Sequence, residues 1–115
     1  GIEIFKSVNS LLSNLIDLDI PVLDSLCDEI NRYPQDKAFR MLHLILSHWL
    51  SQNVKTAAIQ GSRRASDNSR WINVWEYMNH LFHKAESVNL GRKQVILDTF
   101  LSIAAAAHDD SRGTI

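Results

Sequence analysis

Glu76, His80 and His83 are the residues whose types and spacing come closest to a metal site. Spacings of four and seven residues place them on one side of a helix, and carboxylate and imidazole groups are ligands that zinc accepts. However, the pattern is not the His-Glu-x-x-His arrangement of metalloproteases. It also adjoins an apolar stripe, where polar residues normally mark the edge of the buried face. We therefore predict a solvated helix face and no bound metal.

The other histidines and the cysteine also favour structural roles. His43 and His48 are five residues apart, about 140° around a helix, so they cannot share a ligand. Either would be a core or rim histidine that is hydrogen-bonded to a neighbour. Cys27 is the only cysteine, which excludes an internal disulfide and a cysteine-based zinc site. It falls in an apolar repeat, where a thiol behaves as a small hydrophobe.

Three basic residues cluster around one polar segment of the chain. Arg63, Arg64 and Arg70 are conceivable phosphate contacts, but Asp67 partly offsets their charge and no aromatic residue lies between them. The net charge is −1, and neither half of the chain is strongly basic. Nucleic-acid binding usually requires such a basic footprint. We therefore expect no direct nucleic-acid contact.

Motifs for common catalytic chemistry are missing from the sequence. It contains no Walker-type phosphate loop, no Gly-x-Ser-x-Gly elbow and no paired cysteine motif. We therefore expect no cofactor and no enzyme activity. No apolar run approaches the roughly 18 residues of a membrane span, and the first residues lack a signal-peptide pattern. Together with the single cysteine, these features predict a cytoplasmic protein, and the start at Gly1 suggests an excised piece of something longer.

The composition favours an all-α fold. Gly 4 and Pro 2 are too few turn residues for a sandwich or barrel of 115 residues. Apolar periodicity predicts a five-helix bundle, with helices over about 2–16, 21–32, 37–58 and 69–88 and a last one after Gly91. Gly91 would be the N-cap of the last helix, with Leu90 packed on Val95. Residues 1–107 would form one domain, 60–68 a long loop, and 108–115 a disordered tail.

The apolar stripes differ in quality along the chain. In the first helix we expect Phe5, Val8, Leu12 and Leu15 to form the main stripe, with Ile4, Leu11 and Leu18 beside it. In the third, apolar residues nearly encircle the segment 41–50, which is typical of a central helix or of one pressed against a partner. The fourth has the cleanest repeat, in steps of four and three residues: Trp71, Trp75, Met78, Phe82, Ala85 and Asn89.

Residues 71–76 (Trp-Ile-Asn-Val-Trp-Glu) and 81–97 carry a resemblance to a known family. The second stretch reads Leu-Phe-His-Lys-Ala-Glu-Ser-Val-Asn-Leu-Gly-Arg-Lys-Gln-Val-Ile-Leu. Both resemble the C-terminal end of the delta-prime subunit of bacterial DNA polymerase III, in its alphaproteobacterial form. Residues 44–50 fit the same pattern. The chain departs from the family at Gly91, where Asp is usual, although Gly caps a helix nearly as well.

The resemblance implies a clamp-loader subunit, which helps to place the sliding clamp on DNA during replication. In that family, two upstream AAA+-type domains precede a helical collar domain, and the collars of the delta, delta-prime and gamma/tau subunits hold the pentamer together. The nucleotide-binding region, zinc module and arginine finger lie upstream and match nothing here. This chain would be the collar alone, with the delta and gamma/tau collars as its partners and no catalytic role of its own.

Five residues at or beyond the edges of the apolar stripes are the predicted contacts with those partners: Met41, Leu44, Trp71, Tyr77 and Arg92. Trp71 is included because it begins its helix beside the polar loop and because tryptophan is frequent at interface hot spots. Three alternatives remain open. They are the related collar of the gamma/tau subunit, a DNA-binding helical domain that uses the arginines, and a metalloenzyme that uses Glu76, His80 and His83.

Overall fold

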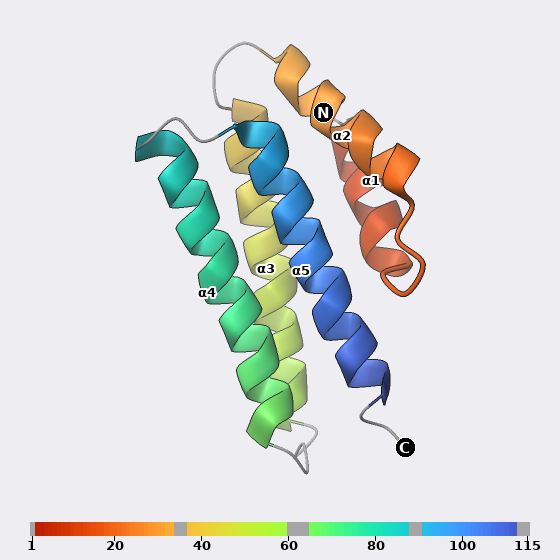
Figure 1. Ribbon diagram of the computed structural model, residues 1–115, viewed down its shortest axis with the longest axis vertical. Coiled ribbons are helices and arrows are strands. Elements are labelled where there is room, and N and C mark those ends of the chain that lie inside the picture. Colours follow the sequence, from red (N-terminus) through yellow and green to blue (C-terminus); the bar gives the residue numbers. More distant parts are fainter. Residues whose placement is uncertain (1, 34–36, 60–64, 88–90, 113–115) are drawn as a thin grey trace.

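The computed structural model describes residues 2–33, 37–59, 65–87 and 91–112 of the chain (Figure 1). Within these ranges the backbone forms helices and no strand, which confirms the predicted all-α, five-helix fold. The helices are α1 (Ile2–Ser13), α2 (Ile20–Arg32), α3 (Lys37–Ile59), α4 (Ala65–Ser87) and α5 (Arg92–Arg112).

The three long helices lie along the longest axis of the molecule, which measures 45 × 28 × 20 Å (Figure 1). The helix α4 packs against both α3 and α5. The shorter α1 and α2 form a hairpin on the other side of α5, where α2 contacts α5 and, less extensively, α3. The fold is therefore a three-helix bundle with a helical hairpin added to one flank.

Short-range interactions set the starts of two helices. The side-chain Oδ1 of Asp19 accepts a hydrogen bond from the Val22 N–H at 3.2 Å, and Pro21 occupies the first turn of α2, where no N–H is needed. At α5, the Gly91 carbonyl accepts from the Val95 N–H at 3.1 Å, which confirms Gly91 as the N-cap. A Cβ at Gly91 would meet no atom within 4 Å, so this position has room for other capping residues. The expected packing of Leu90 lies outside the described residues.

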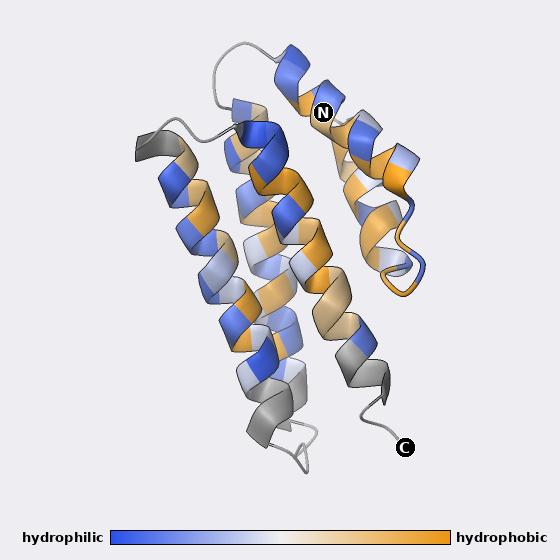
Figure 2. Ribbon diagram, viewed as in Figure 1, coloured by the Kyte–Doolittle hydropathy of each residue, from blue (hydrophilic) through white to orange (hydrophobic). Residues whose placement is uncertain are grey.

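One continuous apolar core joins the five helices. Figure 2 shows hydrophobic and hydrophilic residues alternating along the helices that supply it. Every helix contributes side chains to it, so the hairpin and the long bundle share a single interior. Its largest fully buried members are Phe100, Ile4, Leu11, Leu23, Leu26, Ile30, Leu42, Leu46, Leu50, Met78, Ile96 and Ile103.

The predicted stripe on the first helix was partly wrong. The buried row is Ile4, Val8, Leu11 and Leu15, whereas Phe5 is 52% exposed. Both rows have helical spacing, and they differ by a rotation of about 50°. The contact with α2 determines which row is covered, and that contact is tertiary information that periodicity alone does not contain.

Three helix ends also differ from the prediction. The helix α1 ends at Ser13, where the Asn14 N–H donates to the Leu11 carbonyl at 3.3 Å. The helix α4 begins at Ala65, inside the segment predicted as a loop, because Ser and Asp are well tolerated in a first helical turn. The helix α5 continues to Arg112, into the segment 108–115 predicted as a disordered tail. The Ala-rich run 104–107 strongly favours helix, so the backbone hydrogen bonds of α5 can continue beyond it although no apolar stripe follows.

Phe100 and Leu101 provide a matched test of this core, because they are adjacent in α5 and only Phe100 is buried. We expect Phe100→Ala to lower the free energy of unfolding by about 3–5 kcal/mol through the cavity it leaves. Leu101→Ala, at a side chain that is 50% exposed, should change it by less than about 1 kcal/mol. Urea denaturation followed by circular dichroism measures both, and similar losses would contradict the described core.

Thr99 is the buried polar residue of the described core, and its hydroxyl has no hydrogen-bond partner among the described residues. We expect Thr99→Val to raise the free energy of unfolding by about 1 kcal/mol, because it removes a desolvated polar group and keeps the shape. Thr99→Ser should instead lower it, since it keeps the hydroxyl and loses a buried methyl group. If Thr99→Val is the destabilising change, the hydroxyl has a partner in solution.

Candidate interaction surface

Three of the five predicted contact residues are exposed apolar or aromatic side chains. Leu44 is 72% exposed, and Met41 and Tyr77 are each 44% exposed. Large apolar side chains with this much exposed surface are candidates for contact with another molecule when they adjoin one another. Their positions on the helices decide which of them can act together.

Met41 and Leu44 belong to a row of exposed residues on α3. The residues Lys37, Met41, Leu44, His48 and Lys55 are all exposed, and their spacings of 4, 3, 4 and 7 place them on one side of the helix. We call this row the outer stripe of α3. Leu42, Leu46 and Leu50, on the opposite side, are fully buried. The helix therefore has a core face and a second, solvent-facing apolar patch.

Tyr77 lies on a different surface from this stripe. The side of α4 that faces α3 is marked by Asn79, whose Oδ1 is 2.7 Å from the His43 Nε2. Tyr77 precedes Asn79 by two residues, which places it about 200° away around the helix. Tyr77 and the outer stripe of α3 therefore cannot form one contact patch.

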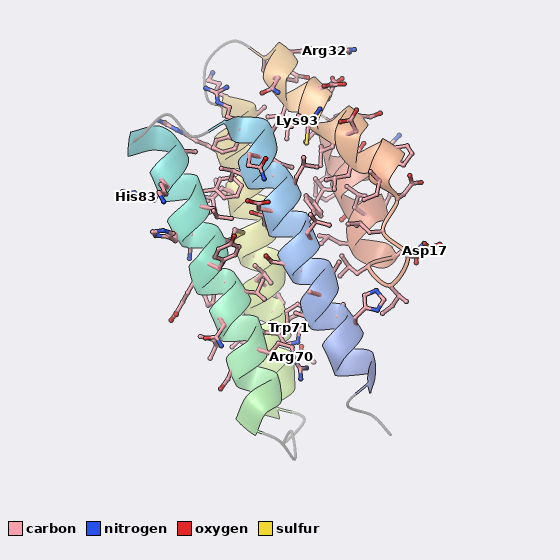
Figure 3. All side chains as sticks on the ribbon, in the orientation of Figure 1. Asp17, Arg32, Arg70, Trp71, His83 and Lys93 are labelled. Carbon is pink, nitrogen blue, oxygen red and sulfur yellow. The ribbon has the colours of Figure 1, made fainter. Side chains whose placement is uncertain are left out.

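Trp71 is a correction to the predicted contacts. It is only 6% exposed and packs edge-on against Trp49, with the ring centroids 5.7 Å apart and the planes at 75°. Figure 3 places it between α4 and the neighbouring bundle helices. Because α4 begins at Ala65 instead of Ser69, Trp71 lies in the second turn of the helix and within reach of α3. Trp71 is therefore a core residue, as the regular stripe on this helix also indicated.

Arg92 is held by an aromatic stack within the chain. Its guanidinium lies 5.6 Å from the centroid of the Phe39 ring, a cation–π distance. Phe39 stacks on Phe82 at 4.6 Å, and Phe82 stacks on His43 at 4.5 Å. Three helices are joined by this column. Arg92 is half-buried, and its contact with Phe39 links the start of α5 to α3.

His43 confirms the expectation that one histidine of α3 would be hydrogen-bonded at the rim. Its Nε2 bonds the Asn79 side chain across the α3–α4 contact, and its ring packs on Phe82. The same expectation is not met by His48, which is exposed on the outer stripe of α3, about 140° around the helix from His43.

The described residues contain no group of three His, Cys, Asp or Glu side chains that is arranged to hold a metal ion. Glu76, His80 and His83 are each exposed on α4, and Figure 3 shows His83 directed outward from that helix. The side chains of Arg63 and Arg64 lie outside the described residues, whereas Arg70 is half-buried and has an interaction within the chain.

Cys27 is a fully buried thiol on α2. Burial raises its pKa to about 11 from the ordinary 9.0, although the positive charge of Lys93 partly opposes this. The Lys93 Nζ is 2.8 Å from Asp24 Oδ1 and links α5 to α2, and the hydrogen bond and negative charge of Asp24 raise the pKa of Lys93. Both side chains are about half exposed, so the pair orients the helices more than it stabilises them.

Other exposed apolar side chains lie away from α3 and were not predicted as contacts. Phe5, Ile16 and Ile20 are each more than half exposed on α1, the α1–α2 connection and the start of α2, and Leu101 is exposed on α5. Phe5 is part of the stripe predicted for the first helix, and Leu101 follows the buried Phe100 on α5. Periodicity could not single them out, since each lies next to residues that are buried.

Comparisons with known proteins give no assignment. No model of a protein family matches the chain, and neither the curated proteins nor the solved structures contain a significant match. In the described part of the chain, no helix is both long and apolar enough to cross a bilayer.

The raised pKa of Cys27 predicts a pH dependence of stability. In the unfolded chain the thiol ionises near its ordinary pKa of 9.0, whereas in the folded chain it stays neutral until about 11. Its contribution to stability is therefore complete below pH 9 and is lost as the pH rises to 11. Between pH 9 and pH 11, we expect the free energy of unfolding of the native chain to fall by about 1–3 kcal/mol more than that of the Cys27→Ala variant. Urea denaturation of both proteins at several pH values measures this, and parallel curves would show that Cys27 is not protected.

Proposed function

We propose that this chain is a collar-type assembly domain of a bacterial DNA polymerase III clamp loader, which acts by binding other subunits and has no catalytic role itself. The observation that carries the proposal is the outer stripe of α3, where Leu44 and Met41 are exposed in the middle of a long bundle helix. A helix whose apolar residues serve both the core and a solvent face is suited to a domain that is covered by a neighbour.

The energetics favour coverage of this stripe. Burying a leucine or methionine side chain contributes roughly 1.5–3 kcal/mol each relative to leaving it exposed. Against this, association costs translational and rotational freedom, so two such residues cannot drive it alone. They can act as the centre of a larger contact, since the buried core of an interface is depleted of charged residues and enriched in aromatic residues and Met.

The identity of the partners is proposed from the resemblance of residues 71–76 and 81–97 to the delta-prime subunit. In that assignment, the neighbours are the collar domains of the delta and gamma/tau subunits, and the assembled loader places the sliding clamp on DNA in the cytoplasm. The room beside Gly91 suits this assignment, since the Cβ of the Asp usual in the family would meet no atom within 4 Å there.

Leu44→Asp is the direct test of the proposal. A carboxylate at the centre of a covered apolar contact would be desolvated without a partner. We therefore expect the chain to bind purified delta and gamma/tau subunits of the same organism, and Leu44→Asp to weaken that binding by about 30-fold or more. Met41→Asp should act in the same direction. Size-exclusion chromatography and calorimetry measure the association, and circular dichroism checks that helicity is kept.

Leu101→Asp is the matched control, because Leu101 is also an exposed leucine but lies on α5. It should leave the association within about threefold of the native value, since surface changes away from a contact have small effects. Absence of binding between the native chain and these subunits would disprove the proposed assembly. Unfolding of the Leu44→Asp chain would mean that Leu44 belongs to the core.

A further inference from the structure

The helix α3 has an unusual charge pattern for an exposed helix. Its 23 residues include the basic side chains Lys37, Arg40 and Lys55 and two histidines, but no Asp or Glu. A helix face that is simply solvated more often mixes charges of both signs, because oppositely charged pairs one turn apart stabilise it. The positive charge on α3 is therefore not balanced within the helix.

The distribution of that charge follows the outer stripe of α3. Lys37 stands at one end and Lys55 at the other, 18 residues apart, which is about 27 Å along the helix. Leu44 and Met41 lie between them, and His48 follows. The stripe therefore runs along one straight side of about five helical turns, with a lysine at each end and its two apolar residues nearer the Lys37 end.

We infer that the outer stripe of α3 is a docking site for an acidic amphipathic helix of a partner subunit. Such a helix would place apolar residues on Leu44 and Met41 and carboxylates opposite Lys37 and Lys55. The inference rests on the proposed assembly function and adds the chemistry of the partner surface. Complementary charge at the ends of an apolar contact selects the partner and fixes its register more than it adds affinity.

The shape of the stripe favours a helix as the occupant. It is narrow and straight, and two helices packed side by side meet along such rows of side chains. The apolar residues of the stripe disfavour a nucleic acid. Phosphates would be met by the two distant lysines, and the exposed Leu44 between them would lie against a charged backbone. Cores of protein contacts, in contrast, are depleted of charge and have a polar rim.

A pair of synthetic peptides tests the inference with the full chain. The acidic peptide has about five helical turns, leucines in the middle of one face, and glutamates at both ends of that face. The basic peptide is identical except for lysines in place of the glutamates. At low salt we expect the acidic peptide to bind, with amide chemical-shift changes centred on Met41, Leu44 and His48, and the basic peptide to bind at least tenfold more weakly.

Charge reversal provides the decisive comparison. The double variant Lys37→Glu with Lys55→Glu should lose about tenfold in affinity for the acidic peptide and gain affinity for the basic one. The core residues of α3 are untouched, and a glutamate near the start of a helix is favourable, so the fold should be kept. The control is Lys6→Glu with Lys84→Glu, which makes the same change in net charge at exposed lysines of α1 and α4 and should bind the acidic peptide as the native chain does.

Several outcomes would overturn the inference. They are a lack of binding of the acidic peptide, equal binding of both peptides, shift changes away from α3, or an equal loss in the control variant. Tighter binding of a DNA duplex to the same stripe would assign it to nucleic acid. Self-association abolished by the same reversal would assign it to a second copy of the chain. The assembly proposal is tested separately, since it fails only if the delta and gamma/tau subunits do not bind.

Discussion

The contact of α4 with α3 and α5 is the constraint on which the rest of the structure depends. The side chains buried on α4 include Met78, Leu81 and Phe82. The column from Arg92 through Phe39 and Phe82 to His43 joins α5, α3 and α4. Because the inner face of α3 packs in the bundle, the opposite side of this helix faces solvent. The exposure of Leu44 and Met41 is thus a consequence of where α4 packs.

The fold class and the buried sides of most helices could be predicted from the sequence, because composition and a three- to four-residue period are local properties. Cys27 on α2 and Met78 and Phe82 on α4 are buried, as their apolar repeats indicated. The rotation of α1 could not be predicted in this way. For Trp71 two signals conflicted, because its stripe indicated the core whereas its place at the predicted helix start indicated a contact. The burial of a side chain in either helix depends on which helix packs against it. For Trp71 it also depends on the start of α4 at Ala65, which lies inside the polar segment predicted as a loop.

The candidate surface was predicted in part. Exposure of Met41, Leu44 and Tyr77 followed from their positions off the main stripes, but the separation of Tyr77 from the other two required the orientation of α4. The lysines at the ends of the outer stripe were overlooked, although a readable signal was there: the stretch 37–59 contains no acidic residue. Charge balance within one helix is a property that apolar periodicity does not measure.

The attachment of the α1–α2 hairpin has a consequence for how the molecule opens. The helix α1 packs chiefly on α2, and α2 in turn reaches the long bundle mainly through α5, beside the Lys93–Asp24 link. Release of α2 therefore removes the main support of α1 as well. Cooperative units of this kind open together and at lower free energy than the whole domain. Slow amide hydrogen exchange would then persist in α3, α4 and α5 after the hairpin has exchanged as one block.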